Sequence, residues 1–174
     1  MSVERIVAGH AIRRRAGDKG FGFQMISQKA KYAFRALLDL ARADEGEAVL
    51  ISDIAERQRI PKKFLEQILL DLKHNGFVHS RRGKFGGYSL LREADKITFG
   101  QIMRTIDGPL APLPCLSRMA YRRCEDCADE EACEIRTVFA RAYEATVRVL
   151  DTTTIADALK LGYVPGIEEE RASA

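Results

Sequence analysis

Several features are missing from this 174-residue sequence, and each absence excludes a class of protein. The sequence has no run of about 18 apolar residues, so we expect no transmembrane helix and no membrane partner. It has no serine–histidine–acid spacing, phosphate-binding glycine loop or metal-hydrolase motif, and its only histidines are His10, His74 and His79. We therefore expect a protein that is not an enzyme.

The two ends of the chain carry little sign of folded structure. Residues 1–24 are basic and lack the apolar core of roughly 7–15 residues that a secretory signal needs. We expect them to be a disordered extension, or the result of a start codon that was assigned upstream of the true start at Met25. Residues 163–174 are polar and are also expected to be disordered. Without a secretory signal, the predicted location is the cytoplasm.

Cysteine is absent from 155 residues and is concentrated in one stretch. All four cysteines fall within 19 residues with the spacing C-x8-C-x2-C-x5-C, at Cys115, Cys124, Cys127 and Cys133. In a reducing compartment, clustered thiols are more often metal ligands or redox sensors than structural disulfides. The stretch is therefore predicted to be a metal site or a sensor.

Charge is distributed unevenly along the chain, although the formal net charge is only +3. Residues 61–94 carry seven Lys or Arg against three Asp or Glu, whereas residues 115–134 carry three against six. A basic module beside an acidic, cysteine-bearing module indicates a polyanionic partner for the basic module only.

Apolar periodicity predicts three helices in the first half of the chain. The first covers residues 28–42, and Ser52 is a suitable N-cap for a short second helix. Pro61 suits the first position of a third helix, which Asn75 and Gly76 are expected to end. The expected buried face of this third helix consists of Phe64, Leu65, Ile68, Leu69 and Leu72.

A hairpin and further helices are predicted after it. The strand-like segments 77–81 and 88–91 flank a basic tip that contains Gly83, Gly86 and Gly87. Capping sequences begin helices at Thr98 and Thr154. Between them, a longer helix is expected at 134–150, with a buried side that consists of Ile135, Val138, Phe139, Ala142, Val147 and Leu150.

Two helices followed by a hairpin are typical of a winged helix-turn-helix. The exposed face of the third helix and the hairpin tip carry side chains that can contact base edges, phosphates or the minor groove. A solvated face, or a winged helix that contacts protein, would show the same pattern. The candidate DNA-binding residues are Lys62, Lys63, Glu66, Gln67, Arg81, Arg82 and Lys84.

Three segments resemble one known family. The segments "QKAKYAFRALLDLA", "ISDIAERQRIPKKFLEQILLDLKHNGFVHSRRGKFGGYSLLR" and "ITFGQIMRTIDGPLAP" are similar to the BadM or Rrf-type (Rrf-two) bacterial transcription regulators. The resemblance runs from about Met25 to about Leu161 and is most specific over residues 64–88. It implies a dimeric winged-helix repressor or activator, often one that senses iron–sulfur status, iron, nitric oxide or redox state.

The resemblance also assigns roles within the chain. It implies that Lys63, Glu66 and Gln67 occupy recognition-helix positions and that Arg82 is the wing arginine. It further implies dimerisation through the long helix that follows the cysteines. The expected organisation is a DNA-binding domain at 25–94, a helix and cysteine loop at 95–133, and a dimerisation helix with a short final helix at 134–162.

Four thiolates are soft donors that suit a [2Fe–2S] or [4Fe–4S] cluster, or tetrahedral zinc. Cluster-binding relatives usually have three cysteines, separated by two gaps. Here the spacing from Cys115 to Cys124 resembles the first of these gaps, and the spacing from Cys127 to Cys133 resembles the second. Zinc, or a metal-free thiol switch through Cys124 and Cys127, are alternatives. Nearby arginines are expected to lower the thiol pKa values; these are Arg118, Arg122 and Arg123.

Together these observations predict a mainly α protein with a small β-hairpin wing, a winged helix-turn-helix followed by a long dimerisation helix. The predicted function is a homodimeric repressor that binds a palindromic double-stranded DNA operator. Its DNA binding is expected to respond to redox, iron or iron–sulfur status through the four cysteines, with an iron–sulfur cluster as cofactor. The alternative is a thiol-switch or zinc-stabilised winged-helix protein that acts through protein–protein contacts.

Overall fold

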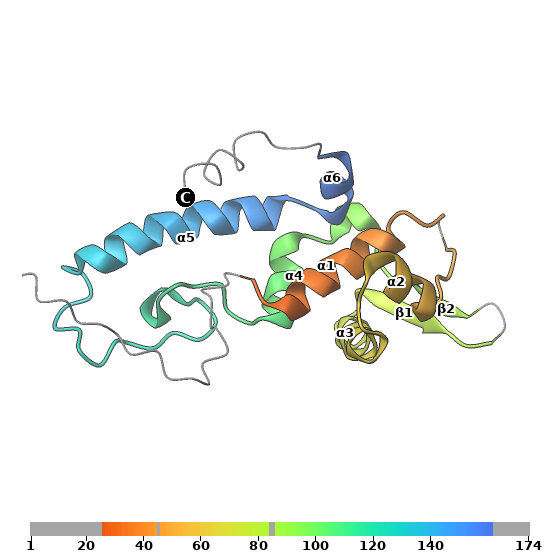
Figure 1. Cartoon of the computed structure of the whole chain (residues 1–174). Helices are drawn as coiled ribbons and strands as arrows, with labels where there is room; N and C mark the ends of the chain where they lie inside the picture. The colour runs from red at the N-terminus through yellow and green to blue at the C-terminus, as the bar shows by residue number, and fades with distance from the viewer. Residues whose placement is uncertain (1–25, 45, 84–85, 162–174) are drawn as a thin grey trace, which may run out of the picture.

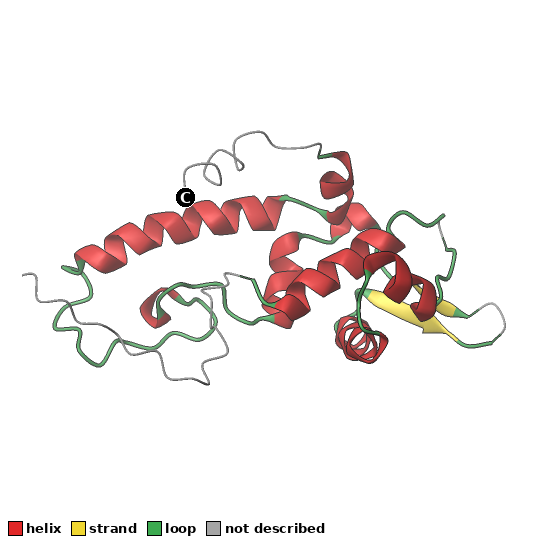
Figure 2. Ribbon diagram, viewed as in Figure 1, coloured by secondary structure: helices red, strands yellow, loops and turns green. Residues whose placement is uncertain are grey.

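The computed structural model describes residues 26–44, 46–83 and 86–161. The predictions for residues 1–24, Met25, Lys84 and 163–174 lie outside these residues. Most of the described chain is helical, with one small antiparallel hairpin (Figure 2). No helix among the described residues is both long and apolar enough to cross a membrane.

The order of elements matches a winged helix followed by a separate long helix (Figure 1). The long helix α5 and the cysteine-bearing loop lie toward one end of the molecule, and the hairpin lies toward the other. The elements are α1 (Gln28–Leu40), α2 (Ile51–Gln58), α3 (Lys62–His74), β1 (Val78–Arg81), β2 (Gly87–Leu90), α4 (Phe99–Ile106), α5 (Glu134–Thr152) and α6 (Ile155–Lys160), with short 3-10 turns η1 (Ala94–Lys96) and η2 (Pro114–Leu116).

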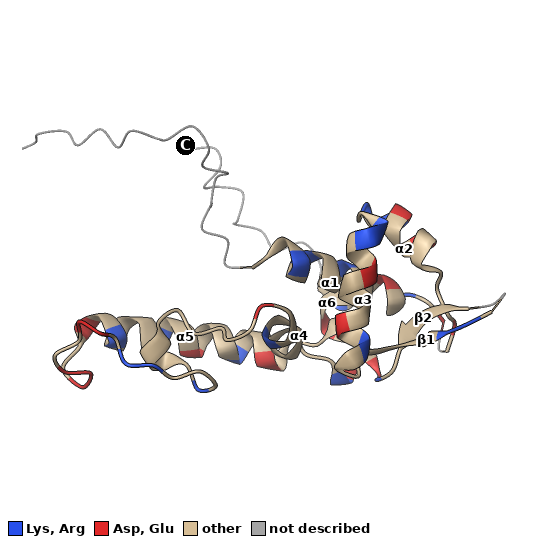
Figure 3. Cartoon of the chain, turned by 90° about the horizontal axis from the view of Figure 1, so that it is seen from below, with Lys and Arg blue, Asp and Glu red and all other residues tan. Residues whose placement is uncertain are grey.

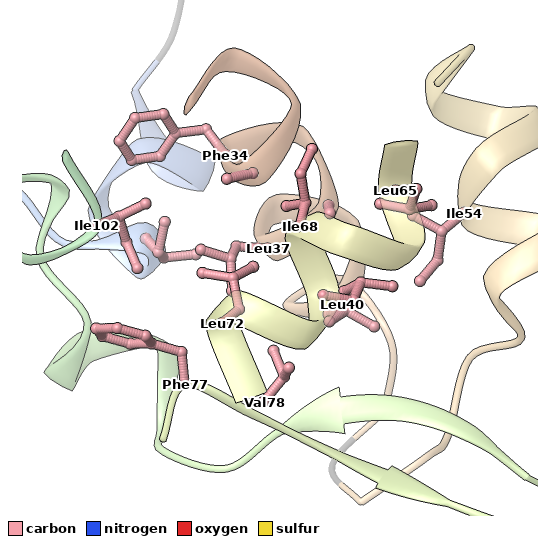
Figure 4. Packing of buried hydrophobic residues seen from close by; sticks show 14 of the residues in the cluster. Phe34, Leu37, Leu40, Ile54, Leu65, Ile68, Leu72, Phe77, Val78 and Ile102 are labelled. Atoms are coloured by element: carbon pink, nitrogen blue, oxygen red, sulfur yellow. The ribbon is translucent and has the colours of Figure 1, made fainter. Parts of the chain in front are cut away.

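The core forms where α1, α2, α3 and α4 meet (Figure 4). The apolar stripe of α3 is fully buried at its centre, because side chains three and four residues apart share one face of a helix. Across α3, the core is completed by residues of α1, α2, the hairpin and α4. Its labelled members are Phe34, Leu37, Leu40, Ile54, Leu65, Ile68, Leu72, Phe77, Val78 and Ile102.

Asn75 is the C-cap of α3 and Gly76 has a left-handed φ of 72°, so these two residues end the helix as predicted. Three local predictions needed correction. Helix α2 begins at Ile51, so Ser52 lies inside it and is not the N-cap. Pro61 is the N-cap of α3 rather than its first residue, since its carbonyl accepts the first bonds of the helix. Phe64 is 36 % exposed and lies edge-on to a Tyr ring of α1 instead of inside the core.

The hairpin is held against the helices by a short third segment. Strand β1 pairs with β2 from Val78–Leu90 to Arg81–Gly87. The backbones of Val49 and Tyr88 exchange two hydrogen bonds of 2.8 Å, so the segment before α2 pairs with β2. Gly87 lies directly against the Val49 carbonyl, where a Cβ atom would collide. The wing therefore has a fixed base on the helical domain.

The predicted capping boxes at the C-terminal half are confirmed. Thr98 caps α4 with Gln101 as its reciprocal partner, and Thr154 caps α6 with Asp157. Ile97 and Ile155 are fully buried, and Ile155 N–H donates to the Ile97 carbonyl over 2.9 Å. Helix α6 thus closes back on the start of α4, and the base of α5 is tied to the winged-helix domain.

Candidate nucleic-acid interface, cysteine loop and long helix

The outer face of α3 combines positive charge with hydrogen-bonding groups. Lys62, Lys63, Glu66 and Gln67 are all exposed, whereas Leu65 behind them is fully buried. The structure gives none of these four polar side chains an ion pair or hydrogen bond to another described residue. Figure 3 shows Lys and Arg on α3 and along the hairpin. The four predicted residues therefore share one free surface at the N-terminal end of α3.

The hairpin carries further exposed basic side chains. Arg81 ends β1, and both Arg81 and Arg82 are exposed. The described part of the tip turns through a hydrogen bond from Gly86 N–H to the Gly83 carbonyl, of 2.9 Å. At the base, Lys73 Nζ of α3 donates to Ser80 Oγ of β1 over 2.7 Å. This bond links the base of the wing to the C-terminal end of α3, the end opposite to Lys62 and Lys63.

Helix α2 is fixed by a buried carboxylate on α1. Asp39 is only 6 % exposed and accepts from Arg57 Nη2 at 2.7 Å, Arg57 Nε at 3.2 Å and Gln58 Nε2 at 2.9 Å. Burial raises the pKa of Asp39, but these hydrogen bonds and the charges of Arg57 and Arg42 outweigh it, so the pKa lies below its ordinary value. Sequence reasoning missed this contact because its partners lie 18 and 19 residues apart.

The four cysteines lie in a segment with little regular structure. Cys115 is buried in η2, and Cys124, Cys127 and Cys133 are partly exposed; all four are free thiols. Cys133 is the N-cap of α5, and its Sγ accepts from the Arg136 N–H over 3.4 Å. The cysteine stretch thus ends at the first turn of the long helix, so a change there acts directly on the start of α5.

The thiol pKa values differ from the prediction. Partial burial raises the pKa of Cys124, and a hydrogen bond with Cys115 raises it further. The pKa of Cys127 is raised by partial burial and by the charge of Cys133, which outweigh the lowering effect of Arg123. The Arg123 guanidinium donates to the carbonyls of Cys127 and Ala128, at 3.0 and 2.9 Å, so it faces the backbone. The net pKa values of Cys124 and Cys127 are therefore raised, contrary to the prediction, and the expected lowering by an arginine is present only at Cys127, where it is outweighed.

The thiols are close enough to influence one another but are not gathered as ligands. Cys115 raises the pKa of Cys124, and Cys133 raises the pKa of Cys127. Among the described residues, no three Cys, His, Asp or Glu side chains converge closely enough to hold a metal ion. The donor chemistry, four soft thiols, fits an iron–sulfur cluster or zinc. Binding either one requires the loop to draw its cysteines closer together.

Helix α5 has two apolar faces, where the sequence suggested one buried side. Val147 and Leu150 are partly buried on the side toward α4 and η2. The opposite apolar stripe is exposed in this chain, and we call it the α5 stripe. Its members are Ile135 (63 % exposed), Val138 (66 %), Phe139 (43 %), Ala142 and Val149 (61 %). Val149 is absent from the predicted set, and the four stripe residues that the prediction included are not buried within the single chain.

An ion pair joins α5 to α4. Arg104 donates to both carboxylate oxygens of Asp151, at 2.6 and 2.9 Å. The Arg104 hydrogen bonds lower the pKa of Asp151, and the charge of Arg118 in the cysteine loop lowers it further. Gly100 of α4 leaves the space that Asp151 fills, because a Cβ there would overlap the carboxylate. The dimerisation helix predicted from sequence is thus docked on α4, which itself packs on α1.

Comparison with known proteins identifies the family. The family described as Rrf2, an iron-dependent transcriptional regulator, matches residues 26–160. The chain belongs to the Rrf2 family. An Rrf2-like putative HTH-type transcriptional regulator from Rhodobacter capsulatus is 51 % identical over 141 residues, covering 79 % of this chain and 94 % of that one. The HTH-type transcriptional regulator CymR of Bacillus subtilis is 33 % identical over 132 residues, covering 76 % and 87 %.

Solved Rrf2-type structures have the same fold. CymR of B. subtilis, described as the global cysteine regulator, has a TM-score of 0.66 and 32 % identity, covering 79 % of this chain and 98 % of that one. T. potens IscR has a TM-score of 0.61 and 31 % identity, covering 78 % and 85 %. The predicted family and winged-helix fold are confirmed. The chain is a regulator of transcription related to CymR and IscR, and its relatives are not enzymes.

Proposed function

We propose that this Rrf2-family chain is a homodimeric repressor that binds a palindromic operator in cytoplasmic DNA and senses redox, iron or iron–sulfur status through its four cysteines. The observation that carries the DNA-binding surface is the free polar face of α3. Lys62 and Lys63 offer phosphate contacts, Gln67 can pair with adenine, and Glu66 can accept from the N4 amino group of cytosine. Each of these side chains is exposed beside a fixed apolar core.

The wing supplies the second contact. Arg81 and Arg82, with Lys84 at the tip by prediction, are placed to reach phosphates or the minor groove while α3 occupies the major groove. Lys73 near the C-terminal end of α3 donates to Ser80 of β1, so the base of the wing lies against that end of the helix. The exposed positive charge on both elements favours a polyanion such as DNA over the alternative, in which the winged helix contacts a protein.

A selection and salt series tests this assignment. The full chain is used to select a duplex from a random double-stranded pool, and affinity is then measured between about 50 and 200 mM salt, where phosphate contacts produce a steep dependence. Serine in place of Arg81 and Arg82 is expected to weaken binding to all duplexes and to reduce the slope. Unchanged affinity would remove the wing from the interface, and salt-independent binding would favour the protein-contact alternative.

The α5 stripe is the proposed dimer interface. Four large apolar side chains on one face of a 19-residue helix are exposed in the single chain. Exposed contiguous apolar surface of this kind marks an interaction site. A second copy of the same helix would cover the stripe symmetrically. The two α3 helices would then bind half-sites that lie about one turn of the DNA helix apart, roughly 34–36 Å.

The cysteine loop is the proposed sensor. Cys115, Cys124, Cys127 and Cys133 would hold a [2Fe–2S] or [4Fe–4S] cluster, which brings electron exchange and sensitivity to iron and oxidants. The loop is irregular over most of its length, so it can close around a cluster without unfolding a helix. A disulfide between Cys124 and Cys127 is the second candidate, supported by the hydrogen bond from Cys127 N–H to the Cys124 carbonyl, which brings the two residues into one turn.

An absorption spectrum distinguishes these sensors. The protein is purified without oxygen, and cluster reconstitution is attempted where needed. A broad band near roughly 400 nm that disappears in Cys→Ala variants is the expected result. A colourless protein that binds stoichiometric zinc, or none, would overturn the cluster assignment and leave zinc or the thiol switch. The DNA-binding assignment does not depend on this result.

The α4–α5 junction is the proposed path from sensor to DNA. Closing or opening the loop would move Cys133 at the start of α5, and the Arg104–Asp151 pair would pass that motion to α4. Helix α4 packs on α1 and α3, so a shift of α5 changes how far apart the two recognition helices lie in the dimer.

A further inference from the structure

A strained arginine stands in the turn between α2 and α3. Arg59 has φ 52° and ψ 47°, and it is the only residue other than glycine with a positive φ in the described part of the chain. The left-handed conformation brings the Cβ atom too close to the carbonyl oxygen and costs a side-chain-bearing residue about 1–2 kcal/mol. Glycine or asparagine is the usual occupant of such a position.

The fold requires this conformation whatever the side chain. Arg59 N–H donates to the Glu56 carbonyl at 3.2 Å, and Ile60 N–H donates to the Ala55 carbonyl at 2.9 Å. This pair of bonds is the Schellman motif, which needs a left-handed residue just past the helix end. Ile60 is 3 % exposed and fixes the turn from inside. The backbone therefore explains the φ angle but does not explain why an arginine stands there.

The folded chain gives the Arg59 side chain no stabilising partner. It is exposed and has no ion pair with any residue that the structure describes. Arg57, two residues earlier, provides the contrast because its guanidinium is bound to the buried Asp39. Of the two neighbouring arginines, Arg57 thus has a structural role, and the described part of the chain shows none for the Arg59 side chain.

We propose that Arg59 is a phosphate-contacting residue of the DNA interface, beside the face formed by Lys62 and Lys63. It stands two residues before Pro61, the N-cap of α3, at the end of the helix that carries both lysines. Strained residues concentrate at functional sites, where the surroundings hold them in place. A guanidinium is the side chain best suited to a phosphate, since it donates two parallel hydrogen bonds. This inference rests on the proposed DNA-binding function.

The test uses the full chain, the duplex selected by the wild type, and three variants. Arg59→Gly and Arg59→Asn remove the cation and suit the left-handed backbone, whereas Arg59→Lys keeps the charge and the strain. We expect Gly and Asn to weaken binding about tenfold at low salt and to reduce the salt slope by about 1.8, two phosphates per dimer. Their thermal midpoints should equal or exceed that of the wild type. Arg59→Lys should keep the wild-type salt slope but lose part of the affinity, because an ammonium group cannot donate two parallel hydrogen bonds.

Each possible result either supports or overturns the role proposed for Arg59. If Arg59→Gly binds with the affinity and salt slope of the wild type while the Arg81/Arg82 serine variant binds more weakly, this inference is overturned and the proposed function is not. A lowered thermal midpoint in both Arg59→Gly and Arg59→Asn would assign a structural role and also overturn it. If the wild type selects no duplex, the proposed function itself fails. Weaker binding together with an unchanged or higher thermal midpoint supports the inference.

Discussion

Replacing Val138 by Glu tests the α5 stripe as a dimer interface. Val138 is 66 % exposed in the single chain, so a partner helix would cover most of its side chain. Full burial of such a side chain is worth about 1.5–3 kcal/mol, which gives about 1–2 kcal/mol for the part that is exposed here. Two-fold symmetry counts each residue twice, so the pair contributes about 2–4 kcal/mol to the dimer.

The carboxylate introduced by Val138→Glu adds its own cost, because burying a charge in an apolar contact is unfavourable. A loss of at least about 2 kcal/mol corresponds to a rise of roughly 30-fold or more in the dimer dissociation constant. Sedimentation velocity over a concentration series at fixed salt measures it. Affinity for a palindromic duplex should fall as well, because each monomer then binds one half-site.

Arg148→Glu is the matched control. Arg148 is exposed on the polar side of α5, has no stripe residue three or four positions away, and receives the same new side chain. We expect it to dimerise like the wild type. A Val138→Glu protein that associates as tightly as the wild type would refute the interface, as would equal losses in the two variants. A far-ultraviolet circular dichroism spectrum for each variant confirms that α5 is intact.

Two further predictions concern stability. Gly100→Ala should cost about 1–3 kcal/mol in urea unfolding, because the new Cβ displaces the Asp151 carboxylate from the α4–α5 junction; an unchanged midpoint would contradict this tight docking. In the folded protein the pKa of Asp39 lies below its ordinary value of 3.8. Its contribution to the free energy of unfolding is therefore complete above pH 3.8 and is lost as the pH falls through the lower, folded-state pKa. Asp39→Asn should lower the free energy of unfolding by about 1–3 kcal/mol at pH 7 and should make stability depend less on pH in the acid range. A pH–stability curve identical to that of the wild type would show that the bonds to Arg57 add no stability.

Much of the winged helix follows from local pattern. The spacing of Leu65, Ile68, Leu69 and Leu72 predicts the buried face of α3, and the structure buries all four. The capping boxes predict where α4 and α6 begin, since their polar partners lie only three residues apart. Features of this kind depend on neighbours within one turn of helix, and these are visible in the sequence.

The features that sequence reasoning missed depend on distant neighbours. Apolar periodicity predicts that much of the circumference of α5 is apolar, but it does not indicate which side packs against α4. It therefore places Val147 and Ile135 on the same buried side. The Asp39–Arg57 contact joins residues on different helices, and the pKa values of Cys124 and Cys127 depend on burial and on which other cysteines lie beside them. These outcomes are decided by tertiary packing, which single-sequence pattern does not encode.

The central claim is that the state of the cysteine loop controls DNA binding. The measurement is the affinity of the oxygen-free protein for its selected duplex, before and after oxidation or iron removal, with Cys127→Ser as the matched variant. We predict that wild-type affinity changes at least about tenfold between the two states, a coupling of about 1.4 kcal/mol, and that Cys127→Ser shows no such change. Equal wild-type affinity in both states, or the same response in Cys127→Ser, would contradict the account.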